Sequence, residues 1–176
     1  MRKAIRSILG AFRGVFGPEM TSAELERRLA PRPGPPGKLT MVALLGDSRD
    51  RELLARVAGE QQWTVHWAFA CGDCGNLARQ SRAQIVLCDR ELAGVPWREV
   101  LQMIVSTKQR IYGILVSKVA DDYLWNEVIR WGGHDVLTAP LREEEVLRAI
   151  RLGWSYWNST MRTHSLMVNP DVSRSR

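Results

Sequence analysis

The sequence has no long apolar run and only three cysteines. No uninterrupted apolar segment in its 176 residues approaches the roughly 18 residues that a bilayer-spanning helix needs, which argues against a membrane span. The first residues are basic, but Arg6 and Arg13 interrupt their apolar positions, which argues against the apolar core of a secretory signal. An odd set of cysteines (Cys71, Cys74 and Cys88) without an export signal predicts reduced thiols and a cytoplasmic location.

Two further absences narrow the function. His134 and His164 have no carboxylate or serine partner at a readable spacing, so we expect no hydrolytic triad and no enzyme. The net charge of +6 resides at the ends of the chain, because residues 41–154 carry 14 basic and 15 acidic side chains. A neutral middle, with no recognisable DNA-binding helix pair after it, predicts no specific binding of nucleic acid.

The N-terminal part reads as an extension of a separate domain. Residues 1–30 are predicted to form a basic amphipathic helical extension, and residues 31–38 a linker rich in proline and glycine. The extension could lie on an anionic membrane surface, dock on a partner, or pack on this protein's own domain. Its apolar side chains recur at helical spacing: Ile5, Ile8, Leu9, Phe12 and Phe16.

From residue 39 onward, short apolar runs alternate with segments of helical period. This alternation is typical of βα units and predicts an α/β fold with a doubly wound, five-stranded parallel sheet over residues 39–157. Residues 158–176 are predicted to be a disordered basic tail. The expected strands are Leu39–Leu45, Trp63–Ala70, Ile85–Cys88, Ile111–Ser117 and Asp135–Thr138. The expected helices include one opened by Pro96, one over Asp121–Trp131 and one over Glu143–Trp154.

The third of these strands ends in a carboxylate. The continuous apolar run Ile85–Cys88 is typical of a strand buried on both faces, and Asp89 follows it directly. Parallel strands deliver their last residues to the carboxyl edge of the sheet, where open α/β folds keep their ligand crevice. Asp89 therefore either stands at the lip of that crevice or only caps a turn.

Three stretches together resemble the receiver domain of response regulators, the flavodoxin-like phosphoacceptor module of two-component signalling. An aspartate ends the third strand in Cys88–Gly94, and a serine ends the fourth in Ile114–Ser117. The stretch Trp131–Pro140 resembles the fifth strand and the proline that follows it. The resemblance covers roughly two thirds of the chain.

The resemblance implies roles for four residues. Asp89 would be the phosphoacceptor and Ser117 the switch hydroxyl that follows the phosphoryl group. Mg²⁺ would be held by Asp47, by Asp89 and by the backbone carbonyl of Glu91. The implied partners are a sensor histidine kinase or another signalling protein. The face made by the fourth helix, fifth strand and fifth helix would serve for docking or as a homodimer contact.

The chain departs from the receiver pattern at charged positions. Gly46 stands where receivers carry a second metal-binding acid, and Ala139 stands in the place of the lysine that pairs with the phosphoryl group. Val136 and Ala93 replace the aromatic switch residue and the proline after the receptor aspartate. These departures predict weak or absent Mg²⁺ binding, and Lys118 is a candidate substitute for the missing lysine.

Two alternatives to a phosphorelay receiver follow from the same residues. The first is a protein-interaction scaffold whose Asp89 never carries phosphate. The second is a thiol redox protein that uses Cys71 and Cys74, because the C-x-x-C motif follows a strand and opens a helix. A zinc site is not expected, because a four-ligand cage would need two more ligands near that pair.

Overall fold

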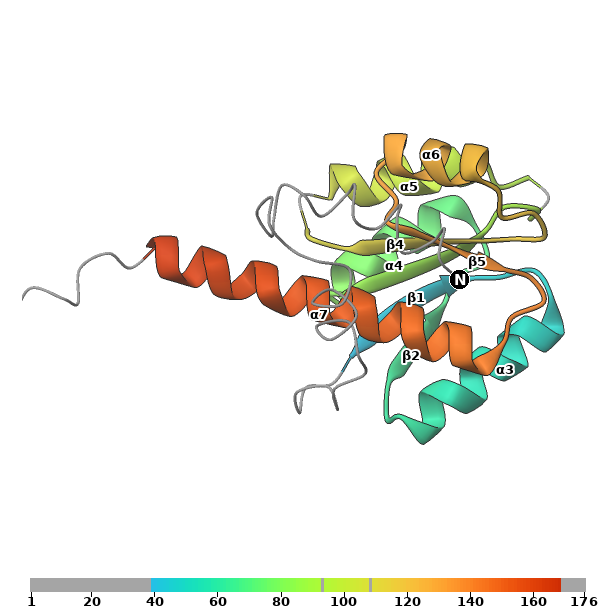
Figure 1. The fold of residues 1–176 in the computed structure, drawn as a ribbon, viewed down its shortest axis with the longest axis horizontal. Coiled ribbons are helices and arrows are strands. Elements are labelled where there is room, and N and C mark those ends of the chain that lie inside the picture. Colours follow the sequence, from blue (N-terminus) through green and yellow to red (C-terminus); the bar gives the residue numbers. More distant parts are fainter. Residues whose placement is uncertain (1–38, 93, 108, 169–176) are drawn as a thin grey trace, which may run out of the picture. The chain divides into compact units, whose positions relative to one another are not determined.

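The computed structural model describes residues 39–92, 94–107 and 109–168 of the chain, with side chains described up to residue 158 (Figure 1). Strands and helices alternate throughout this part, as the βα pattern predicts. The basic extension of residues 1–30 and the linker of residues 31–38 lie outside the described residues. Their predicted helix and its membrane or partner contacts therefore stay predictions.

All five strands are parallel and form one sheet in the order β2-β1-β3-β4-β5. This order reverses direction between β1 and β3, so the loops after these two strands open on opposite faces and leave a crevice at the carboxyl edge between them. The predicted parallel sheet is confirmed. The strands are β1 Thr40–Leu44, β2 Thr64–Trp67, β3 Ile85–Asp89, β4 Tyr112–Ser117 and β5 Asp135–Thr138.

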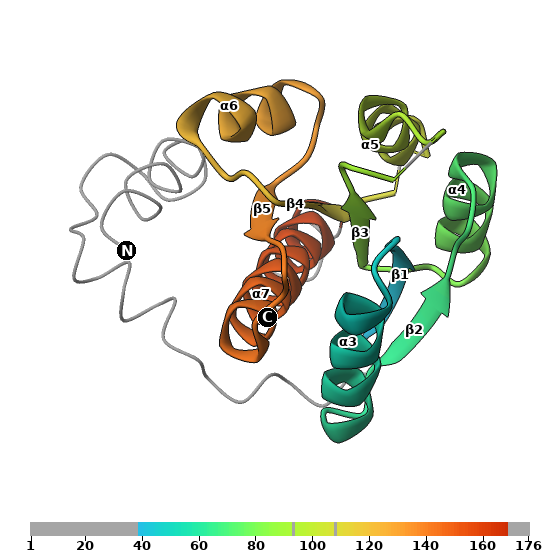
Figure 2. The same ribbon diagram turned by 90° about the vertical axis from the view of Figure 1, so that its right-hand side faces the viewer.

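Five helices cover the two faces of this sheet. Helices α4, α5 and α6 pack on one face, while α3 and α7 pack on the other (Figures 1 and 2). The doubly wound arrangement is therefore confirmed. The helices are α3 Ser48–Glu60, α4 Cys71–Gln80, α5 Trp97–Ser106, α6 Asp122–Arg130 and α7 Glu143–Val168.

The central strands are apolar on both faces. In β3, Ile85 and Leu87 pack under α3 and α7, whereas Val86 and Cys88 pack under α4 and α5. All four side chains have no exposed surface. Burying a side chain of this size contributes about 1.5–3 kcal/mol. Packing on both faces therefore holds β3 in place, and with it the backbone position of Asp89 at the end of the strand.

Polar side chains start two of the helices. Asp47 is the N-cap of α3, and Asp121 is the N-cap of α6. Each carboxylate accepts backbone N–H groups that have no partner inside the helix. Pro96 was expected inside the first turn of α5, but it lies one position earlier, as the N-cap of a helix that begins at Trp97. With ψ near 107°, Pro96 keeps an extended backbone, which places it before the helix.

The predicted end of the last helix and the disordered tail of residues 158–176 are wrong for residues 158–168. Helix α7 runs without a break from Glu143 to Val168. Serine, threonine and asparagine occur in this stretch, but they cost a helix only tenths of a kcal/mol each. No proline occurs between Leu141 and Asn169, so nothing in the sequence forces an earlier end. No described helix is long and apolar enough to cross a bilayer.

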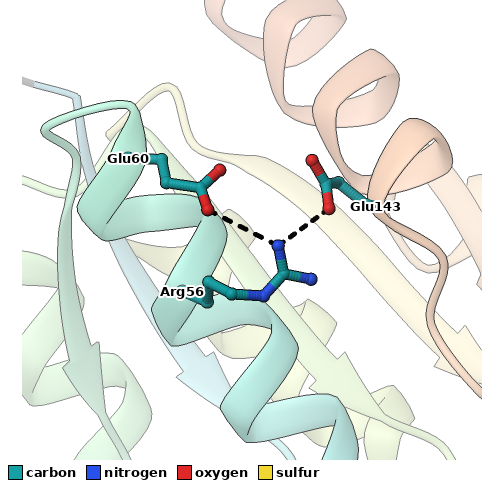
Figure 3. Close-up of polar contacts among 3 residues, drawn as sticks. All are labelled: Arg56, Glu60 and Glu143. Atoms are coloured by element: carbon teal, nitrogen blue, oxygen red, sulfur yellow. Dashed lines mark hydrogen bonds and ion pairs between the residues drawn. The ribbon is translucent and has the colours of Figure 1, made fainter.

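Two contacts hold α3 against the start of α7. Asp50, which is 5% exposed, accepts a hydrogen bond from Leu141 N at 2.7 Å. On the surface, Arg56 Nη1 lies 2.9 Å from Glu143 Oε2 and 3.5 Å from Glu60 Oε1 (Figure 3). The buried hydrogen bond is the structural anchor, because an exposed ion pair adds little to stability.

Candidate functional site

Asp89 lies at the carboxyl edge of the sheet, as predicted, with a half-buried side chain. Its two carboxylate oxygens accept backbone hydrogen bonds from two different loops. Gly46 N donates to Oδ2 at 3.1 Å, and Glu91 N donates to Oδ1 at 2.9 Å. The first bond joins the end of β3 to the loop after β1 and so ties Asp89 to both strand ends. The carboxylate is more than a turn cap, because the bond from Gly46 spans 43 positions of the chain.

The acidic side of this crevice is reduced to Asp47, and Asp47 is already engaged. Its Oδ1 accepts from Arg49 N at 2.8 Å and from Asp50 N at 3.3 Å, which caps α3. Gly46 adds no side chain. A Cβ at Gly46 would lie 3.3 Å from Asp89 Oδ2 and 3.0 Å from a methyl group of Leu92. The absence of a side chain is what lets the Gly46 N–H approach the Asp89 carboxylate.

The Ser117 hydroxyl is buried and fully hydrogen-bonded. It donates to Glu91 Oε1 at 3.0 Å and accepts from Val119 N at 3.2 Å. Arg90 Nη1 lies 3.4 Å from the same oxygen, at the long end of the hydrogen-bond range. Ser117 itself has no exposed surface. The side chains of Arg90 and Glu91, both exposed residues, thus reach back from the loop after β3 to cover the end of β4.

The positive charge nearest Ser117 comes from Arg90. Ala139, at the position where receivers carry a lysine, provides no charge, and Lys118 is exposed at the surface. Lys118 was the expected substitute for that lysine, and Arg90 was not expected in this place. The sequence did carry a signal for Arg90. It is one of two charged residues that directly follow Asp89, and residues after the end of a parallel strand lie at the carboxyl edge of the sheet.

The described donor set does not fit a tight magnesium site. Mg²⁺ favours octahedral oxygen ligands, usually one or two carboxylates with several waters. Among the described residues, no group of three His, Cys, Asp or Glu side chains is arranged to hold a metal ion. Of the predicted ligands, Asp47 caps a helix and Asp89 accepts two backbone bonds, while Glu91 was expected to contribute only its backbone carbonyl. Weak or absent magnesium binding stays a prediction.

The cysteine pair lies where the sequence places it, at the start of α4. Cys71 opens the helix, and Cys74 is buried one turn later. Burial raises the pKa of both thiols, that of Cys74 to about 12, with the neighbouring Glu99 adding to the effect at Cys71. A redox thiol needs a lowered pKa so that the thiolate forms, and these environments act in the opposite direction.

A second group of titratable side chains lies at the amino ends of β4 and β5. The ring of His134 stacks on Tyr112 at a centroid distance of 4.7 Å, and Tyr156 of α7 packs against both rings. Gly113 N donates to His134 Nδ1 at 3.1 Å. Burial lowers the pKa of His134 to about 4 and raises the pKa of Asp135 to about 6. Burial therefore favours the neutral form of both groups, and the cluster lies at the opposite end of the strands from Asp89.

Comparisons with known proteins support the fold. The sequence matches no protein-family model and no curated protein. Solved structures do match, and receiver domains are among them. A CheY-like receiver domain protein from Methanospirillum hungatei has a TM-score of 0.63 at 13% identity, covering 70% of this chain and 99% of its own. The signal receiver domain of an HD domain-containing protein from Pseudomonas fluorescens has a TM-score of 0.63 at 18% identity, with the same coverage.

A third structure is the non-phosphorylated HemR receiver domain from Leptospira biflexa, with a TM-score of 0.60 at 19% identity. The match covers 67% of this chain and 95% of the HemR domain. The described part of the chain is therefore a doubly wound α/β domain of the flavodoxin type. More narrowly, it has the fold of a response-regulator receiver domain, which confirms the resemblance seen in the sequence.

Proposed function

We propose that this chain is a receiver-like signalling module that acts in the cytoplasm by binding other proteins, without catalysing a reaction and without needing phosphate on Asp89. The observation that supports it best is the Ser117 hydroxyl. A hydroxyl has one proton to donate, and the Ser117 proton is directed to Glu91 Oε1. A phosphoryl group on Asp89 would find this donor already in use.

The distribution of charge supports the same proposal. Transfer of a phosphoryl group to a carboxylate brings two anions together, so a cation and positive side chains must offset them. Here Gly46 replaces the second acid and Ala139 replaces the lysine of the receiver pattern, so one negative and one positive charge are missing. The remaining acid, Asp47, caps α3. Weak or absent Mg²⁺ binding follows from this arrangement.

The partner would be a sensor histidine kinase or another signalling protein. A suitable surface is formed by α6, β5 and α7, because both helices contact β5 and the three lie together in Figure 2. Tyr123, 73% exposed, lies in α6, and Val119, 52% exposed, lies in the loop before it. Large exposed apolar side chains are typical of protein-contact sites. A homodimer through this surface is the other form that such a contact could take.

The test is phosphorylation of the purified protein by acetyl phosphate at several Mg²⁺ concentrations, read as intact mass. We expect no mass gain in the wild-type protein. The matched variant is the double substitution Gly46→Asp and Ala139→Lys, which restores both missing charges. Leu92 has to move to admit the new side chain, because a Cβ at Gly46 would lie 3.0 Å from its methyl group, so the fold of the variant is checked by circular dichroism first. This variant should gain the mass of one phosphoryl group, and a further Asp89→Asn substitution should abolish the gain.

One observation favours a second candidate, in which Asp89 is a phosphoacceptor despite the incomplete site. Its carboxylate is half-buried at the crevice, and the backbone N–H groups of Gly46 and Glu91 donate to it. These two donors hold the carboxylate in one direction at the edge of the sheet, and a fixed orientation favours attack by a nucleophile. A mass gain in the wild-type protein that Asp89→Asn abolishes would establish this candidate and overturn the phosphate-independent one.

A further inference from the structure

We infer that the Glu91 carboxylate is a built-in anion that holds the Ser117 hydroxyl in place, as an external anion bound at the crevice would. The inference rests on the proposed function, because it explains how a receiver-like module could keep one state without phosphate. Glu91 then acts as a positioning residue through Ser117. The contact between Glu91 Oε1 and Ser117 Oγ is the starting point.

The backbone places Glu91 beside Ser117. Arg90 N donates to Val116 O at 2.8 Å, which extends the pairing of β3 with β4 one residue beyond Asp89. Glu91 N then turns back to Asp89 Oδ1. These two backbone bonds fix the start of the Glu91 side chain next to the end of β4. The carboxylate therefore reaches a neighbouring strand end, although residues 91 and 117 are 26 positions apart.

The hydrogen bonds of Ser117 show that the carboxylate decides where the hydroxyl points. Val119 N and Arg90 Nη1 both donate to the oxygen, so neither fixes the direction of its proton. Glu91 is the acceptor that does. A bond from a hydroxyl to an ionised carboxylate is about twice as strong as one between neutral groups. Without this acceptor the Ser117 side chain would no longer be held in one rotamer, and a change of rotamer would move its oxygen away from the Val119 N–H.

The guanidinium of Arg90 completes the resemblance to an anion site. Arg90 places a positive charge beside the Ser117 hydroxyl. Ala139, at the position of the receiver lysine, supplies no such charge. A hydroxyl proton, a positive side chain and an anion are the three parts of such a site. Here all three belong to the chain, and the anion comes from the loop that follows Asp89.

The experiment measures hydrogen exchange and chemical shift of the Val119 amide by NMR in the absence of any phosphodonor. We expect Glu91→Ala to speed exchange at Val119 roughly fivefold, the equivalent of one hydrogen bond. Glu52→Ala, the removal of an exposed acid on α3, is the matched control and should leave Val119 unchanged. In a Ser117→Ala background, Glu91→Ala should have no further effect, because both changes act through the same hydroxyl.

Glu91→Gln separates the charge from the hydrogen bond, because the amide still accepts but is neutral. An exchange rate between those of the wild-type protein and Glu91→Ala supports an anion, whereas a rate equal to that of the wild-type protein overturns it. An unchanged Val119 amide in Glu91→Ala, or additive effects with Ser117→Ala, would also overturn the inference. These outcomes are independent of the phosphorylation assay, since no measurement here depends on modification of Asp89.

Discussion

The two ends of strand β4 treat ionisable groups in opposite ways. At the carboxyl end, the charged side chains of Arg90 and Glu91 stay exposed and reach in to a buried neutral hydroxyl, that of Ser117. At the amino end, His134 and Asp135 are themselves partly buried, and desolvation shifts the pKa of each in the direction that favours its neutral form. Perturbed pKa values often mark functional sites, but here they mark the packed end of the strand.

The largest effect is expected at the packed end. Tyr112, 2% exposed, stacks on His134 and contacts Tyr156, so Tyr112→Ala removes a buried ring and leaves a cavity. We expect a loss of about 3–5 kcal/mol in the free energy of unfolding. Urea denaturation followed by circular dichroism measures it. Tyr112→Phe keeps the ring and serves as control, and a small loss in Tyr112→Ala would show that the cluster does not stabilise the fold.

The second effect is a pair of opposite pH slopes. The pKa of His134 is lowered from 6.5 to about 4, so the unfolded chain binds more protons in that window and stability falls as the pH falls through it. The pKa of Asp135 is raised from 3.8 to about 6, so the folded chain binds more protons there. Stability then falls as the pH rises. In the wild-type protein the two contributions oppose each other between about pH 4 and 6.

Single substitutions should separate these contributions. Asp135→Asn leaves His134, so its stability should rise with pH between about 4 and 6.5. His134→Gln keeps an acceptor for Gly113 N and leaves Asp135, so its stability should fall between about pH 4 and 6. Denaturation midpoints at several pH values measure both slopes. Equal slopes in the two variants would refute the assignment of the groups.

A smaller effect is expected at the carboxyl end. Ser117→Ala deletes a buried hydroxyl, but Glu91 is exposed and can return to water. The Val119 N–H loses its acceptor, and we expect a loss of about 1 kcal/mol in the free energy of unfolding. The same urea titration measures it. A loss as large as that of Tyr112→Ala would mean that both ends of β4 contribute equally to the stability of the fold.

The smallest effect on stability is expected at the exposed ion pairs of Arg56. Arg56→Ala breaks the pairs with Glu143 and Glu60, but the arginine side chain is 53% exposed. We expect a denaturation midpoint indistinguishable from that of the wild-type protein, because water and salt screen such pairs. Leu54→Ala, a fully buried position on the same helix, should be clearly destabilising and serves as the control.

The sequence predicted the sheet and its order of elements well, because both depend on local patterns. Continuous apolar runs such as Ile85–Cys88 mark central parallel strands, and the fifth strand, Asp135–Thr138, has the predicted bounds. The sequence analysis did not predict how far α7 runs. Residues 154–168 contain no proline or glycine, and the first residue that ends a helix is Pro170.

The site was predictable in position but not in its contacts. Asp89 and Ser117 were placed correctly, since the end of a strand fixes where a residue lies. The hydrogen bond from Ser117 to Glu91 depends on side-chain direction across two strands, which no sequence spacing reveals. Asp50 was missed for the same reason. Its partner, Leu141 N, lies 91 positions away.

The continuity of α7 has a mechanical consequence. Its first part packs under β4, where Gly153 lies so close to Tyr112 that an added Cβ would be 2.7 Å from the ring. From Gly153 the same helix runs 15 residues further, about 23 Å at the usual rise per residue. Figure 1 shows this part extending beyond the strands. A small tilt of α7 at its contact with Tyr112 would therefore displace the last turn of the helix by a larger distance.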